Sequence, residues 1–160
     1  MKQVVSVADM KVSANPGDTL VTYALGSCLG ITVYDPVAHV GGMLHVMLPL
    51  STINPAKANV NPYTFVDTGV PELFMAAYKN GAWKDRLVVK VAGGACTGGS
   101  EAGDHFQIGK RNVIILRKLL WKNSVMLEAT DVGGSDSRTM SLDIGTGFVT
   151  LKLNGTSRTL

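Results

Sequence analysis

The chain has 160 residues with 15 basic and 12 acidic side chains, a net charge of +3, and this mild excess does not favour a nucleic-acid-binding protein. Hydrophobic residues make up 46% and charged residues 17%, which excludes a disordered chain and supplies a core for one domain. No apolar run reaches the roughly 18 residues that span a bilayer, and polar residues interrupt the N-terminal segment too early for a signal peptide. With two cysteines and no expected disulfide framework, the sequence predicts a cytoplasmic protein that does not insert into the membrane.

Strands are expected through most of the first half of the chain. Segments rich in Val, Ile, Thr and Tyr alternate with turn sequences such as Asn-Pro-Gly-Asp at 15–18, and both features favour strands joined by tight turns. We expect strands at 3–7, 19–24, 29–35 and 42–48. The stretch 50–64 contains two Asn-Pro steps and little periodicity, so it is predicted to be a surface loop near the functional site.

Two segments have the spacing of amphipathic helices, 66–80 and 108–122. The apolar face of the first consists of Val70, Leu73, Phe74, Ala77 and Tyr78. The apolar stripe of the second consists of Val113, Leu116 and Leu120. Pro71 is expected in the first turn of its helix, because a proline further inside removes a hydrogen bond. Gly81 is expected to cap the C-terminus of the same helix.

Further strands are expected at 86–94, 124–131, 140–144 and 149–153, with a glycine-rich loop at 95–107. A short Gly-Thr-Gly connection joins the last two strands. About eight strands and two main helices result, and short turns make many neighbouring strands antiparallel. Strands and helices do not alternate regularly. The sequence therefore predicts an α+β fold, a layered sandwich of mostly antiparallel sheet, and not a doubly wound parallel sheet.

Three kinds of site are not favoured by the sequence. The stretch GGACTGGSEAG lacks the glycine patterns of nucleotide-binding loops. Zinc sites favour paired ligands at short spacing, which is not seen among the cysteines and histidines, Cys28, Cys96, His39, His45 and His105. Ser27 is not part of a Gly-x-Ser-x-Gly motif, so it is expected only to keep a turn tight. We expect neither a metal nor an organic cofactor.

Cys28 is the candidate nucleophile. It lies between Gly26 and Gly30, where two predicted strands meet and a side chain can be presented at the surface; the alternative is a buried core cysteine. A thiol needs a neighbouring base, because the thiolate is the reactive form. His45, in another apolar segment, is the best candidate, although it too could be a core residue that binds the backbone. An imidazole also needs an acceptor for its second nitrogen, and Thr22 can supply one.

The stretch TYALGSCLGITVYDPVAHVGGMLHVMLP, residues 22–49, resembles the signature of the CheD family. Four later stretches also resemble that family: VDTGVPELFMAAYKNGA, KVAGGA, IGKRNV and DVGGSDSRTMSLDIGTG. The resemblance covers nearly the whole chain in order. One departure is GGSDSR, where the family often has a more glycine-rich turn, and this leaves the role of Arg138 open.

The resemblance implies a single CheD-like deamidase domain over 1–160, with Cys28 as nucleophile, His45 as base and Thr22 as third member. It implies a fold similar to the catalytic domain of cytotoxic necrotizing factor. The implied reaction is hydrolysis of glutamine side-chain amides to glutamate, through a cysteine thioester, on the cytoplasmic helical domain of methyl-accepting chemoreceptors. A second implied partner is the CheC phosphatase, and a non-catalytic protein that docks on CheC is the alternative. Because a receptor helix needs a shallow groove, we expect the rim of the site at 50–64 and 95–107.

Overall fold

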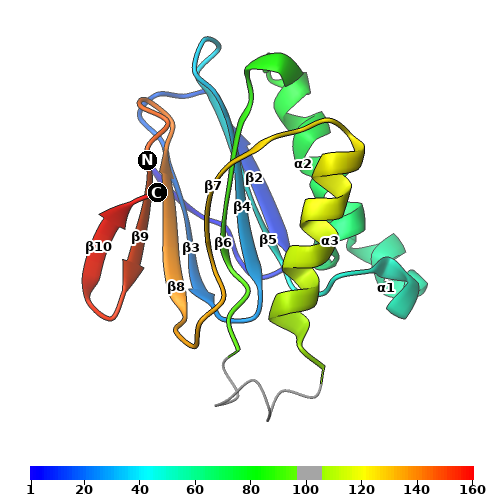
Figure 1. The fold of residues 1–160 in the computed structure, drawn as a ribbon. Helices are drawn as coiled ribbons and strands as arrows, with labels where there is room; N and C mark the ends of the chain where they lie inside the picture. Colours follow the sequence, from blue (N-terminus) through cyan, green and yellow to red (C-terminus); the bar gives the residue numbers. More distant parts are fainter. Residues whose placement is uncertain (97–105) are drawn as a thin grey trace.

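Two five-stranded sheets and a layer of helices form the fold of residues 1–96 and 106–160, which the computed structural model describes (Figure 1). The first sheet has the order β1 (Lys2–Val4), β3 (Thr19–Leu25), β8 (Arg138–Asp143), β9 (Val149–Leu153) and β10 (Thr156–Thr159). The second has the order β2 (Asp9–Ser13), β5 (Val40–Val46), β4 (Leu29–Asp35), β6 (Val88–Gly93) and β7 (Leu127–Val132). Most pairs are antiparallel, but β1 with β3 and β6 with β7 are parallel.

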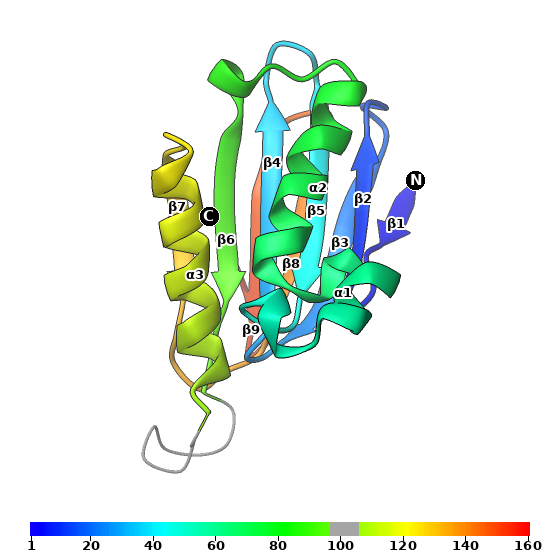
Figure 2. The same cartoon turned by 90° about the vertical axis from the view of Figure 1, so that its right-hand side faces the viewer.

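The helices cover the outer face of the second sheet. The two long helices are α2 (Val66–Lys79) and α3 (Ile108–Lys122), and both lie over this sheet and run roughly along its strands (Figure 2). The short helix α1 (Pro55–Val60) precedes α2. Three 3-10 turns complete the helical segments: Ser51–Ile53, Pro62–Thr64 and Lys84–Arg86. The second sheet is therefore the middle one of three layers.

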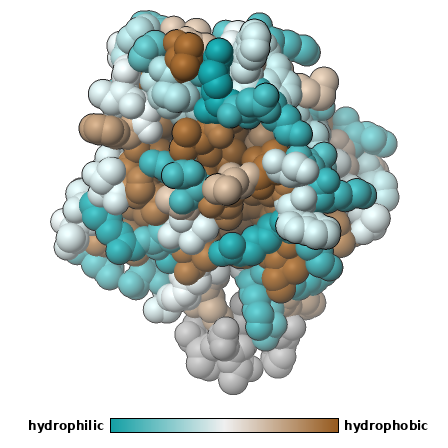
Figure 3. Space-filling view, turned by 45° about the horizontal axis from the view of Figure 1, so that its top comes forward, coloured by the Kyte–Doolittle hydropathy of each residue, from teal (hydrophilic) through white to brown (hydrophobic). Residues whose placement is uncertain are grey.

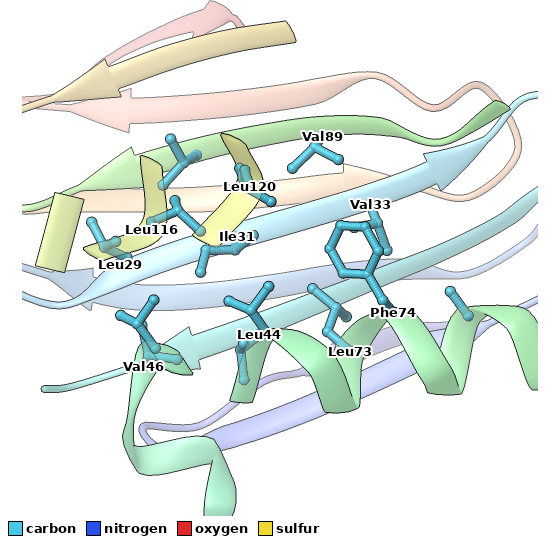
Figure 4. Close-up of a cluster of buried hydrophobic side chains, with 14 of the residues drawn as sticks. Leu29, Ile31, Val33, Leu44, Val46, Leu73, Phe74, Val89, Leu116 and Leu120 are labelled. Carbon is cyan, nitrogen blue, oxygen red and sulfur yellow. The ribbon is translucent and has the colours of Figure 1, made fainter. Parts of the chain in front are cut away.

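Hydrophobic side chains fill the space on both sides of the middle sheet. Between this sheet and the helices lie Leu29, Ile31, Val33, Leu44, Val46, Leu73, Phe74, Leu116 and Leu120 (Figure 4). Between the two sheets lie Leu20, Leu25, Met43, Met140, Leu142 and Leu151. Successive residues of a strand point to opposite faces, so β4 and β5 are buried at every position. Full burial of one such side chain is worth about 2 kcal/mol, and the two strands that frame the candidate site are thus held firmly.

The predicted α+β class is confirmed, and the described residues form ten strands and three helices. The sequence did not indicate β2, an edge strand that pairs with β5 alone and is mostly half-buried, so its side chains show no clear alternation. The prediction of a loop over 50–64 is wrong for α1. There the side chain of Asn54 accepts a hydrogen bond from the N–H of Lys57 at 3.1 Å, and Pro55 occupies the first turn. A helix of six residues is too short to show periodicity.

Pro71 lies inside α2, as its sixth residue, and the expectation that it occupies the first turn is wrong. The helix begins at Val66 and buries a face that includes Val70 and Leu73 against the sheet. This packing outweighs the backbone hydrogen bond that proline cannot donate. After Asn80 the chain passes through Gly81 at a φ of +106°, in agreement with the predicted cap.

Candidate active site

The turn that carries Cys28 connects the two sheets. Strand β3 of the first sheet ends at Leu25 and β4 of the second begins at Leu29, so residues 26–28 cross between them. The strand before the turn is irregular, because its pairing with β8 shifts between Thr22 and Leu25 and Ala24 has a φ of +57°. Irregular backbone of this kind is common at functional sites. Cys28 therefore lies at a boundary between strands, as the sequence predicts.

Strand pairing places Cys28 and His45 on the same face of the middle sheet. Gly30 of β4 lies directly opposite His45 of β5, and Cys28 precedes Gly30 by two residues, so all three point the same way. This face looks toward the first sheet, since a Cβ on Gly30 would lie 2.8 Å from atoms of Leu25 and Met140. Cys28 packs against the same cluster. The thiol and the imidazole thus come from diagonal neighbours on adjacent segments.

A chain of hydrogen bonds orients the ring of His45. Its Nδ1 lies 2.7 Å from Oγ1 of Thr22, and that hydroxyl donates to the carbonyl of Val5 at 2.7 Å. A hydroxyl has one proton to donate. Because the Thr22 hydroxyl donates this proton to the carbonyl of Val5, it must accept a hydrogen bond from Nδ1–H of His45. The nitrogen with the lone pair is then Nε2, which is buried and has no hydrogen-bond partner, Cys28 included, among the described residues. The expected contact of Thr22 with the ring is present, and the catalytic roles of the three residues stay predictions.

Burial keeps the thiol and the imidazole neutral. His45 is fully buried, and desolvation lowers the pKa of its imidazole from 6.5 to about 4. Desolvation also raises the pKa of the Cys28 thiol, although the residue's own backbone N–H acts in the opposite direction. At neutral pH the two groups are therefore a thiol and an uncharged imidazole, not a thiolate and an imidazolium.

Backbone groups after β6 hold the turn. The N–H of Gly94 donates to the carbonyl of Cys28 at 2.9 Å, and the N–H of Ala95 donates to the carbonyl of Gly26 at 2.8 Å. Gly93 has a φ of +114°, and a Cβ there would lie 2.1 Å from the carbonyl oxygen of Cys28. Only glycine allows the two backbones to approach this closely.

Arg138 supports this region from the first sheet. It is 5% exposed and pairs with Asp131 at 3.0 Å. Its guanidinium donates to the carbonyls of Gly93, Gly133 and Asp136 at 3.3, 2.8 and 3.2 Å. Arg138 therefore fixes the glycine turns beside the turn that carries Cys28, and this answers the question that the sequence leaves open about its role.

Asn112 of α3 is a residue that the sequence analysis did not single out. Its Nδ2 donates to the carbonyls of Ser27 and Met47 at 3.0 and 3.1 Å. Ser27 itself takes part through its backbone, in accord with its expected role in the turn. A signal was available, because Asn112 is a polar residue on the helical face that contains Leu116 and Leu120, four and eight residues later.

A groove of about 580 Å³ lies between α3 and the turns that follow β6 and β7. Its lining includes Ala95, Cys96, Gln107, Lys110 and Arg117. Parts of the predicted rim at 95–107 thus border a groove. Residues 97–105, with His105 among them, lie outside the described residues.

The segment 50–64 contacts the end of β5. The carbonyl of Thr64 accepts from the N–H groups of Met47 and Leu48 at 2.9 and 3.0 Å, so this segment lies close to the strand that carries His45.

A separate apolar surface is seen where hydrophobic residues are exposed together among polar ones on the face shown in Figure 3. Large exposed hydrophobic residues of the molecule include Val37, Trp83, Trp121 and Met126. Surfaces of this kind are common where proteins bind one another.

The other residues considered from the sequence lie apart from this site. His39 is in an exposed turn and bonds to the hydroxyl of Tyr34 at 3.0 Å.

Within 1–96 and 106–160, no three or more histidine, cysteine, aspartate or glutamate side chains group in a way that could hold a metal ion. In the same two ranges, no helix has the length and apolar character needed to cross a membrane.

Comparison with known proteins identifies the family. Residues 47–153 match the family model described as CheD chemotactic sensory transduction. A relative from Solibacter usitatus, named probable chemoreceptor glutamine deamidase CheD, is 49% identical over 98% of this chain and 92% of its own length. A relative from Syntrophus aciditrophicus, named probable chemoreceptor glutamine deamidase CheD 1, is 47% identical over 95% of this chain and 94% of its own length. A relative from Thermococcus kodakarensis, also named probable chemoreceptor glutamine deamidase CheD, is 38% identical over 95% of this chain and 92% of its own length. The chain therefore belongs to the CheD family.

Proposed function

We propose that this protein is a chemoreceptor glutamine deamidase that uses Cys28 as nucleophile, His45 as base and Thr22 as the residue that orients the base. The names of its relatives support the substrate. The observation that carries the catalytic assignment is the hydrogen bond between Thr22 and Nδ1 of His45, which leaves the lone pair on a buried, unpartnered Nε2 among the described residues. That lone pair belongs to a side chain on the same face of the sheet as the thiol.

The reaction begins with attack of the Cys28 sulfur on the carbon of a glutamine side-chain amide. The thiol proton passes to Nε2 of His45, and the carbonyl oxygen becomes an oxyanion that needs hydrogen-bond donors. Backbone N–H groups of the turn are the candidate donors. The tetrahedral intermediate then expels ammonia, which takes the proton from His45, and a thioester remains. His45 removes a proton from water, and the resulting attack on the thioester releases glutamate and restores the thiol.

The neutral resting pair determines when the proton moves. Since the pKa of His45 is lowered to about 4 and that of Cys28 is raised, proton transfer accompanies attack on the amide and does not precede it. The base form of His45 persists down to about pH 5, so acid inactivation is expected only below that pH. No metal or organic cofactor is needed for any of these steps.

The proposed partner is the cytoplasmic helical domain of a methyl-accepting chemoreceptor, which places the enzyme in the cytoplasm. We also propose that CheC docks on this protein, and a non-catalytic regulator of CheC is the second candidate function. His45, hydrogen-bonded to Thr22 and on the same face of the sheet as Cys28, favours catalysis, because docking alone does not require an oriented base. The similarity to cytotoxic necrotizing factor stays a prediction that depends on the family resemblance.

The test is deamidation of a receptor cytoplasmic fragment, followed by ammonia release and by the mass change of receptor peptides. Cys28→Ala should abolish the reaction and leave the thermal unfolding midpoint almost unchanged, because the two side chains have similar volumes. Cys96→Ala is the matched control, since this half-buried cysteine has no assigned base, and should keep the activity. Activity of Cys28→Ala near that of the wild-type protein would refute the assignment.

A further inference from the structure

Asn112 is a buried amide that the proposed reaction does not use as a reacting group. It is the fifth residue of α3 and is fully buried. Asparagine is a poor helix former, and burial of its amide is unfavourable unless the amide is hydrogen-bonded. Its Oδ1 has no partner among the described residues. The two hydrogen bonds donated by its Nδ2 are therefore the interactions that compensate for its burial.

These two bonds join the ends of β4 and β5. The pairing of the two strands ends at Leu29 opposite Val46. Beyond that pair, the carbonyls of Ser27 and Met47 both accept from Nδ2 of Asn112, at 3.0 and 3.1 Å. An amide nitrogen has two protons, and both are used. The side chain thus continues the connection between the strands past the point where their backbones separate.

The bond to Ser27 also sets the direction of the next N–H. None of the described peptide bonds is cis, and in a trans peptide the C=O and N–H point in opposite directions. With the carbonyl of Ser27 held toward α3, the N–H of Cys28 points away from α3, and it belongs to the residue that carries the sulfur. A donor beside the attacking sulfur is close to the carbonyl oxygen of a bound amide, where negative charge develops.

We infer that Asn112 is a positioning residue for the reaction, which holds the peptide between Ser27 and Cys28 so that the N–H of Cys28 stabilises the oxyanion. Asn112 acts through this peptide and does not itself reach the reacting atoms. The inference rests on the proposed function, because it takes Cys28 as the nucleophile.

Two variants test the inference, Asn112→Ala and the near-isosteric Asn112→Asp, which puts an oxygen in place of the donating nitrogen. Both are made with Cys96→Ala, so that Cys28 is the one remaining cysteine in the chain. We expect kcat for ammonia release to fall about 10²-fold with KM changed less than about threefold, the loss typical of a missing oxyanion donor. Alkylation of Cys28 by iodoacetamide should stay within about threefold of the parent rate, because displacement at a saturated carbon forms no oxyanion.

The matched control is Leu120→Ala, which removes packing from the same helix without touching the turn. It should lower the thermal unfolding midpoint and keep kcat, measured at a temperature where it is folded. Parental kcat in both Asn112 variants would overturn the inference. A fall in kcat matched by an equal fall in alkylation would also overturn it, because Asn112 would then serve only to keep the turn folded. Deamidation by Cys28→Ala would instead refute the proposed function.

A measurement on the wild-type protein does not depend on the variants folding. A receptor peptide with glutamate semialdehyde in place of the target glutamine should form a hemithioacetal: the sulfur of Cys28 adds to the aldehyde carbon, the C=O becomes a C–O single bond, and the thiol proton passes to the oxygen. In a crystal structure of this adduct, we expect that oxygen within hydrogen-bond distance of the Cys28 nitrogen, with the Ser27 carbonyl still on Asn112. An oxygen bound only by other donors would overturn the inference.

Discussion

Replacement of His45 should change how stability depends on pH, and the structure gives the size of the effect. The imidazole titrates at about 4 in the folded chain, against 6.5 for an exposed histidine. The unfolded chain therefore binds a proton between these values that the folded chain does not bind, and the free energy of unfolding falls as the pH is lowered from 6.5 to 4. The full shift is worth about 3 kcal/mol, of which about 2 kcal/mol is lost between pH 7 and pH 5.

The assay is urea unfolding of the wild-type protein and of His45→Gln at pH 7 and pH 5. We expect the variant to be less stable at pH 7 and to lose about 2 kcal/mol less than the wild-type protein on going to pH 5. Asp9, Asp18 and Asp35 do not contribute in this range, because their pKa values lie below 3.8.

Leu120→Ala is the matched control, which removes buried packing but no titratable group and should keep the wild-type dependence on pH. If His45→Gln lost as much stability as the wild-type protein between pH 7 and pH 5, the reasoning that His45 is buried and neutral would be refuted. An NMR titration of the His45 ring that showed a midpoint near pH 6.5 would refute it independently.

Three further outcomes are expected. Thr22→Val leaves Nδ1–H of His45 without its acceptor and should lower kcat about 10²-fold, whereas Thr22→Ser keeps the hydroxyl and most of the activity; equal rates for the two variants would contradict the orienting role. Gly93→Ala should destabilise the protein by more than about 2 kcal/mol in urea unfolding, because a Cβ meets the Cys28 carbonyl, whereas Gly134→Ala, with no atom near its Cβ, should cost about 1 kcal/mol; similar losses would refute the clash. Added CheC should inhibit deamidation in a way that rising receptor concentration relieves if both bind one surface, and full activity at saturating CheC would show that docking occurs elsewhere.

Local patterns predict the parts of the fold whose burial is periodic. The strand at 29–35 and the helix at 108–122 have the bounds expected from their apolar residues, because those residues follow the period of the element they form. The edge strand β2 and the helix α1 lack that signal, since one is mostly half-buried and the other has six residues. The local signal for α1 is the Asn-Pro step before it, because Asn54 caps the helix and Pro55 occupies its first turn.

The candidate site shows a different limit. Thr22, Cys28 and His45 can be proposed from residue types and from a family resemblance. The residues that hold the surrounding turns in place cannot, because their contacts depend on long-range packing. Asn112 is 85 and 65 residues away from the two carbonyls it binds, and Arg138 is 45 residues away from Gly93. No local pattern states which helix covers which strand ends, so these contacts follow only from the three-layer arrangement.

The protonated state of Cys28 also bears on oxidative damage. Hydrogen peroxide oxidises thiolates to sulfenic acid far more readily than it oxidises thiols. Because burial raises the pKa of Cys28 and the neighbouring imidazole is uncharged, the idle enzyme presents a poor target to peroxide at neutral pH. In the proposed reaction its sulfur becomes strongly nucleophilic only as it attacks an amide, and a protein that works in this way is spared the peroxide sensitivity of enzymes that keep a permanent thiolate.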